Sequence, residues 1–89
     1  MSNQPVRVLL VDDDEDDYIL TRDLLSESQG IRFELEWVST WDLALELMAQ
    51  KEHAVYLLDY RLGTHNGLEL LQQAVANGCR VPIILLTGQ

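Results

Sequence analysis

The sequence predicts an α/β fold built on a parallel sheet. Four short apolar stretches have the character of strands, at 6–11, 32–38, 54–58 and 81–86, and amphipathic segments separate them. Strands that alternate with helices form right-handed β-α-β units, because parallel strands need a crossover connection. We therefore expect the order β-α-β-α-β-α-β in one domain over residues 1–89.

The first half of the chain predicts two strands and one helix. Val6–Val11 is apolar apart from Arg7, a pattern typical of a strand covered on both faces. Segment 14–28 has apolar residues at helical spacing and an acidic first turn that suits a helix N-terminus, and Gly30 ends it. Residues 32–38 alternate between large apolar side chains and glutamates, which indicates a half-exposed strand near the sheet edge.

The second half continues the alternation. Ser39 is the expected N-cap of a helix over 41–48, and the third strand follows that helix. Residues 61–66 are expected to form a loop, and apolar spacing over 68–75 predicts a third helix. The fourth strand is almost uniformly apolar, so we expect it to be buried on both faces.

Composition limits the classes of partner. The 89 residues carry 15 acidic and 6 basic side chains, a net charge of −9, and 47% hydrophobic residues. This balance argues against nucleic acid or an anionic membrane as partner, because proteins bind both through Lys and Arg side chains that neutralise phosphate. Cys79 is the single cysteine, and no stretch has the pattern of a secretory signal or the length of a membrane span. We therefore predict that the protein is cytoplasmic.

Acidic residues follow two of the predicted strands. Asp12 and Asp13 come directly after the first strand, and Asp59 follows the third. Ligands of parallel sheets bind outside the carboxyl ends of the strands, so these side chains should gather there. Clustered carboxylates repel, and a hard divalent cation such as Mg²⁺ removes that conflict. The sequence therefore predicts a Mg²⁺-assisted phosphate site.

These motifs, each at a strand end or loop, resemble those of the response regulator receiver domain of bacterial two-component signalling. In chain order they are Asp12-Asp13, Asp59, Gly67 and Thr87-Gly88. The resemblance extends from Val6 to Gly88. It implies a flavodoxin-like, doubly wound parallel sheet of order 2-1-3-4, the N-terminal portion of a receiver, without the helix, strand and helix that complete that fold.

The resemblance also implies roles for single residues. Asp59 would be the phosphoacceptor, Asp13 a direct ligand of Mg²⁺ (or Mn²⁺), and Asp12 a ligand through water. The main-chain carbonyl of Arg61 would supply a third metal ligand, and Thr87 the switch hydroxyl. The phosphoryl donor would be a sensor histidine kinase or a phosphotransfer protein. Such a protein is no enzyme beyond its own phosphorylation and dephosphorylation.

Departures from the family pattern leave an alternative open. Gly63 replaces the usual proline, the fifth-strand lysine is absent, and Lys51 is the only lysine of the chain. The alternative is a receiver-like interaction module that accepts no phosphoryl group. An apolar fourth strand without a later element to cover it further predicts a homodimer, or an exchange of elements between two copies.

Two other resemblances are weaker. Asp12 and Asp14 form the Asp-x-Asp of haloacid dehalogenase-type phosphohydrolases, but the later motifs of those enzymes are missing. An EF-hand calcium loop over 12–23 lacks its turn glycine. Acids 14–17 are otherwise expected to form a charged helix start. The tryptophans are expected to pack near a sheet edge, and the histidines, His53 and His65, to lie on the surface or in loops.

Overall fold

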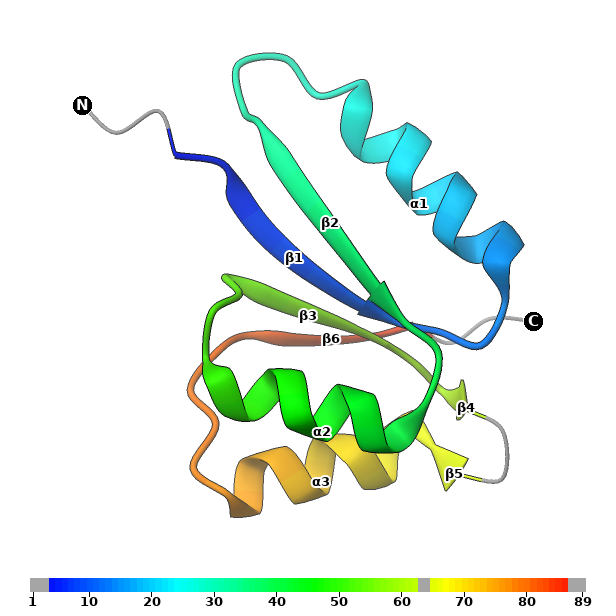
Figure 1. Cartoon of the computed structure of the whole chain (residues 1–89), viewed down its shortest axis with the longest axis vertical. Coiled ribbons are helices and arrows are strands. Elements are labelled where there is room, and N and C mark those ends of the chain that lie inside the picture. The colour runs from blue at the N-terminus through cyan, green and yellow to red at the C-terminus, as the bar shows by residue number, and fades with distance from the viewer. Residues whose placement is uncertain (1–3, 63–64, 87–89) are drawn as a thin grey trace.

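The computed structural model describes residues 4–62 and 65–86 (Figure 1). The elements in chain order are β1 (Val6–Val11), α1 (Glu15–Ser26), β2 (Phe33–Val38), α2 (Trp41–Gln50), β3 (Val55–Asp59), β4 (Arg61–Leu62), β5 (His65–Asn66), α3 (Gly67–Ala76) and β6 (Ile83–Leu86).

The main sheet has the strand order β2-β1-β3-β6, and its neighbouring strands are all parallel. Figure 1 shows α1 on one side of this sheet, and α2 and α3 on the other. The predicted α/β, flavodoxin-like fold of order 2-1-3-4 is therefore confirmed. The strand order reverses between β1 and β3, which places the topological switch point at the carboxyl ends of these two strands.

The hydrophobic core lies between the sheet and the helices α2 and α3. Alternate residues of a strand point to opposite faces, so every second residue of β1 and β3 enters this core. The buried members of the cluster are Leu9, Val11, Val38, Ala44, Met48, Tyr56, Leu58, Leu70 and Ala74. The helices supply four of these residues, two from α2 and two from α3, so the core anchors both helices to the sheet.

The α1 side of the sheet is covered unevenly. Tyr18 of α1 stacks on Trp37 of β2 with ring centroids 5.0 Å apart. Trp37, Leu10, Leu57 and Ile84 form one row across the four strands. Leu10 is fully buried, Leu57 is half-buried, and Ile84 is 50% exposed. The expectation that the fourth strand is buried on both faces is therefore wrong, because α1 covers only the β2–β1 half of this face.

Several local predictions need correction. Thr40, and not Ser39, caps α2, because its Oγ1 accepts a hydrogen bond from the Leu43 N–H at 3.4 Å. The predicted loop over 61–66 contains the short antiparallel pair β4–β5, whose register pairs Arg61 with Asn66. The same Asn66 caps α3 by accepting from the Glu69 N–H at 2.8 Å.

Gly67 begins α3 at the point where the helix touches the end of β3. A Cβ atom at this position would overlap the main-chain carbonyl oxygen of Asp59 and lie 2.9 Å from Cδ1 of Leu85. The Gly67 N–H donates to the carbonyl oxygen of Tyr60 at 2.7 Å. Only glycine permits this approach, so the sequence spacing of Asp59 and Gly67 has a steric cause.

Replacing Gly67 by alanine is expected to lower the free energy of unfolding by about 3 kcal/mol, because the overlapped atom belongs to the backbone and cannot move aside cheaply. Urea denaturation followed by circular dichroism measures the change. Gly78→Ala is the control: it meets open space at φ +84° and should cost only about 1 kcal/mol of left-handed strain. Equal losses in the two variants would contradict the steric explanation.

Candidate metal centre

Three carboxylates meet at the carboxyl edge of the sheet. Asp12 follows β1, Asp59 ends β3, and Asp17 lies in the first turn of α1. One oxygen atom from each lies within 4.8 Å of the other two. Carboxylate oxygens at this mutual separation are the ligands that a hard divalent cation accepts, with water completing its coordination.

Asp12 is held by three hydrogen bonds, two to its backbone and one to its side chain. Its N–H donates to the carbonyl oxygen of Val38 at 3.1 Å, and its own carbonyl oxygen accepts from Nε1 of Trp37 at 2.7 Å. Its Oδ1 accepts from the Asp14 N–H at 2.9 Å. The side chain is consequently fixed while only 2% of the residue remains exposed.

Sequence reasoning missed Asp17, which it treated as part of a charged helix start. Asp14 caps α1 by accepting from the Asp16 N–H at 2.9 Å, and this cap sets the helical phase. Helical side chains lean toward the N-terminus, so Asp17 reaches back over the first turn toward Asp12. Its position in the sequence could have identified it. Asp17 is the third residue of the helix that comes after the acid at the end of the first strand, Asp12.

Burial raises the pKa of Asp12 to about 7. The Asp14 N–H opposes this shift, whereas a hydrogen bond with Asp17 and the charge of Asp59 add to it. Desolvation disfavours the charged form of a carboxyl group, and nearby carboxylates act in the same direction. In the absence of a cation, a proton on Asp12 is what relieves the repulsion.

Asp59 is half-buried, and burial also raises its pKa. The N–H groups of Arg61 and Tyr60 donate to its carboxylate and oppose this rise, while the charges of Asp13 and Asp17 reinforce it. Asp13 therefore lies close enough to act on Asp59, although it is exposed and outside the group of three. The role of Asp13 as a direct metal ligand stays a prediction.

Arg61, Thr87 and Gly88 are the remaining predicted site residues. Arg61 contacts Asp59 through its N–H, and the assignment of its carbonyl as a metal ligand stays a prediction. Thr87 and Gly88 lie outside the described residues. The strand before them ends beside the site, because Leu86 is the register partner of Asp59 and its carbonyl oxygen accepts from the Tyr60 N–H at 2.9 Å.

His53 lies in the loop between α2 and β3, as one of the two expected placements, but it is buried and does not lie on the surface. Only 1% of its side chain is exposed, and its Nε2 lies 2.8 Å from Oε1 of Glu36. It takes no part in the acidic group. Trp37 also does more than pack at an edge, because its indole N–H fixes the backbone of Asp12. Loop and edge positions hid both roles from the sequence pattern.

The sequence matches the family model of the response regulator receiver domain over residues 8–89. The chain therefore belongs to the response regulator receiver domain family. A comparison with curated proteins found no match to this sequence. Within residues 4–62 and 65–86, no helix has the length and apolar character needed to cross a membrane.

Solved structures similar to this chain carry the same fold. One is the MaeR response regulator bound to beryllium trifluoride, with 26% identity and a TM-score of 0.83, where the match covers 94% of this chain and 68% of that one. Another is the receiver domain of a sensor histidine kinase from Pseudomonas aeruginosa, described with a magnesium ion coordinated in its active site cleft. It has 28% identity and a TM-score of 0.79, and the match covers 94% of this chain and 68% of that one.

A third is a bacteriophytochrome response regulator, RtBRR, with 32% identity and a TM-score of 0.78. The match covers 97% of this chain and 58% of that one. The chain thus spans roughly three-fifths to two-thirds of the length of the structures it resembles.

Metal affinity should depend on pH through Asp12. A raised pKa means that the folded state binds this proton more tightly than the unfolded state. The stability contributed by the protonated group is present below the ordinary pKa of 3.8 and is lost as pH rises to about 7. A divalent cation competes with the same proton, so Mg²⁺ should bind roughly tenfold more weakly at about pH 6 than at about pH 8.

Titration with Mg²⁺ followed by tryptophan fluorescence tests this expectation, because Trp37 is bonded to the backbone of Asp12. The control is Asp12→Asn, which removes the titrating proton and should flatten the pH dependence while weakening binding. An affinity for Mg²⁺ that is the same at both pH values in the unsubstituted protein would contradict the assignment of the proton.

Proposed function

We propose that this chain receives a phosphoryl group on Asp59 from a phosphohistidine of a sensor histidine kinase or phosphotransfer protein, in the cytoplasm of a bacterium. The observation that supports the proposal most strongly is the convergence of Asp12, Asp17 and Asp59 in a chain of the receiver family. Asp59 is the member of this group that ends the central strand β3, and its half-buried side chain remains partly accessible to a donor.

The transfer is a displacement at phosphorus. A carboxylate oxygen of Asp59 attacks the phosphorus atom and forms an O–P bond. The P–N bond to the donor imidazole breaks, and its electron pair leaves with the imidazole nitrogen. The N–H groups of Tyr60 and Arg61 orient the Asp59 carboxylate for this attack. The product is an acyl phosphate on Asp59.

The acidic group fits Mg²⁺ as the resident cation, with Mn²⁺ as a substitute of the same coordination chemistry. Asp12 and Asp17 are placed to hold it, together with Asp13 and the Arg61 carbonyl as proposed further ligands. When bound, the cation neutralises the negative charge of the transferring phosphoryl oxygens. Thr87 is the proposed hydroxyl partner of the new phosphoryl group.

Asp59→Asn tests the assignment of the phosphoacceptor. Incubation of the unsubstituted protein with acetyl phosphate and Mg²⁺ should add one phosphoryl group, and the variant should gain none, because the amide is not a nucleophile of this kind. Intact-mass spectrometry measures both. Asp23→Asn is the matched control, since Asp23 is exposed on α1 and pairs with Arg22, away from the site.

The outcomes separate the two proposed functions. If the Asp59→Asn variant gained a phosphoryl group to the same extent as the unsubstituted protein, the acceptor would be another residue. A protein that gains no phosphoryl group, with all variants folded, would instead favour the receiver-like interaction module.

We further propose that a second copy of the chain packs against the exposed half of the α1 side of the sheet. Ile84 is 50% exposed on β6, and Leu20 and Leu24 of α1 are 60% and 59% exposed. Apolar side chains exposed on an edge strand, and on a helix at the same side of the sheet, are typical of an interface. Two copies each carry a charge of −9, so screening by salt should favour their association.

Ile84→Lys should weaken self-association by about tenfold or more, because it places a charge on the apolar row of β6. Sedimentation velocity over a range of concentrations measures the dimer fraction. Val75→Lys is the matched control, since Val75 is 61% exposed on α3, on the opposite side of the sheet. A protein that sediments as a folded monomer at high micromolar concentration would argue against the interface.

A further inference from the structure

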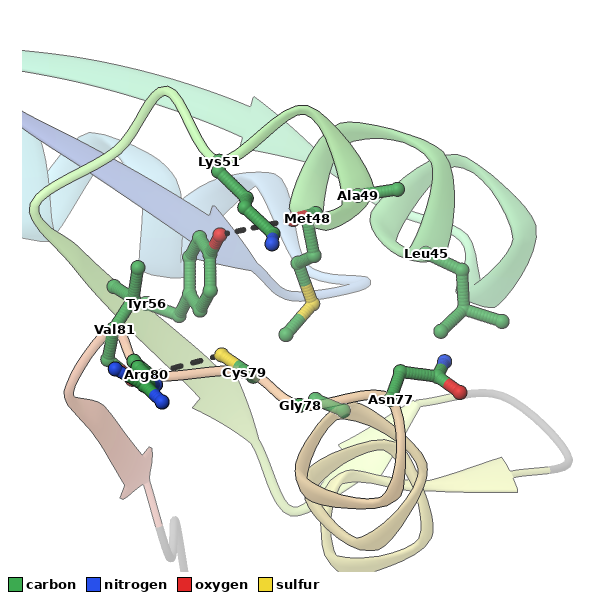
Figure 2. Close-up of a pocket in the computed structure, with 11 residues that line it drawn as sticks. Leu45, Met48, Ala49, Lys51, Tyr56, Asn77, Gly78, Cys79, Arg80 and Val81 are labelled. Atoms are coloured by element: carbon green, nitrogen blue, oxygen red, sulfur yellow. Dashed lines mark hydrogen bonds between the residues drawn. The ribbon is translucent and has the colours of Figure 1, made fainter.

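A cavity of about 760 Å³ lies between the C-terminal end of α2 and the segment that leads from α3 into β6 (Figure 2). We propose that this cavity binds a small organic anion with an apolar body, such as an aromatic or short aliphatic carboxylate or sulfonate. The cavity lies at the amino ends of β3 and β6, whereas Asp59 ends β3 at its carboxyl end. The proposal therefore stands independently of phosphoryl transfer.

The inner wall of the cavity is apolar. Met48, Leu45 and Val81 line it, and the ring of Tyr56 closes it from the sheet side (Figure 2). Tyr56 is fully buried, and its hydroxyl donates to the carbonyl oxygen of Met48 at 3.2 Å. The polar atom of this wall is thus already satisfied, so the inner space favours an apolar group. Volumes of this size are typical of sites for small ligands.

The rim of the cavity carries positive charge. Lys51 lies on the α2 side and Arg80 on the segment before β6, and both are exposed. Neither forms an ion pair with any residue that the structure describes. Among those residues, no Asp or Glu lines the cavity. In a chain with 15 acidic and 6 basic residues, two unpaired cations beside one apolar cavity form a local site for an anion.

Lys51 occupies a backbone position that favours glycine. It is the C-cap of α2 with φ 58°, and it is the only non-glycine residue with positive φ in the part of the chain that the structure describes. A lysine here costs free energy that glycine would avoid, because its Cβ crowds the backbone in this conformation. The ammonium group at the cavity rim supplies a reason for keeping lysine at this place.

Naphthalene-1-sulfonate is a probe of the proposed chemistry, and its uncharged counterpart is naphthalene-1-methanol. Titration of ¹⁵N-labelled protein should shift the amide signals of residues around the cavity, such as Met48, Tyr56 and Cys79, with the sulfonate. Arg80→Gln should weaken binding of the sulfonate about threefold. The double variant with Lys51→Gly should weaken it about tenfold, because two partly exposed ion pairs are then lost.

The variants separate binding from folding. Lys51→Gly suits the left-handed conformation, so its melting temperature should equal or exceed that of the unsubstituted protein. Arg32→Gln is the matched control for charge, since Arg32 is exposed and lines a different cavity beside β2. Asp59→Asn should bind the sulfonate unchanged, which distinguishes this site from the phosphoryl site.

Three results would each overturn the proposal. One is equal affinity for the sulfonate and the alcohol, which would show that the negative charge of the ligand does not contribute to binding. Another is equal weakening by Arg32→Gln and Arg80→Gln, which would show only the effect of net charge. The third is a set of shifted amides that lies away from the cavity.

Discussion

The structure depends on a repulsion that the fold creates and must relieve. The reversal of strand order between β1 and β3 brings Asp12 and Asp59 to one edge, and the cap of α1 adds Asp17. Because Asp12 is almost fully buried, its charge is poorly solvated beside the other two. Such a site must hold a proton or a cation. The raised pKa of Asp12 and its proposed Mg²⁺ ligation are therefore two consequences of one geometry.

Maintaining this geometry requires support from residues that carry no charge. The indole of Trp37 holds the carbonyl of Asp12, and Tyr18 stacks on the same ring. On the other side of the site, Gly67 lets α3 approach the backbone of Asp59 more closely than any side chain would allow. The hydrophobic core between the sheet and α2 and α3 fixes the strand ends from which these contacts extend.

Periodicity predicted the four strands of the main sheet, the three helices and their order along the chain, because burial on a sheet or helix face leaves a regular pattern in the sequence. Asp12 and Asp59 were found because acids at strand ends stand out against apolar runs. Asp17 was hidden within a run of acids, and only the helical phase set by Asp14 distinguishes it. The burial of His53 beside Glu36 depends on contacts between distant segments, which a local pattern does not encode.

The backbone of Tyr60 connects the site to the rest of the sheet. Its N–H donates to the carbonyl of Leu86 at the end of β6, and its carbonyl accepts from Gly67 at the start of α3. Both elements are thus bonded to the residue that directly follows Asp59. The proposed phosphoryl group on Asp59 would act on this peptide first, so its effect would reach β6 and α3 together. Since β6 also carries the exposed Ile84, the hydrogen bond from Tyr60 links the acidic edge to the strand that bears the apolar face.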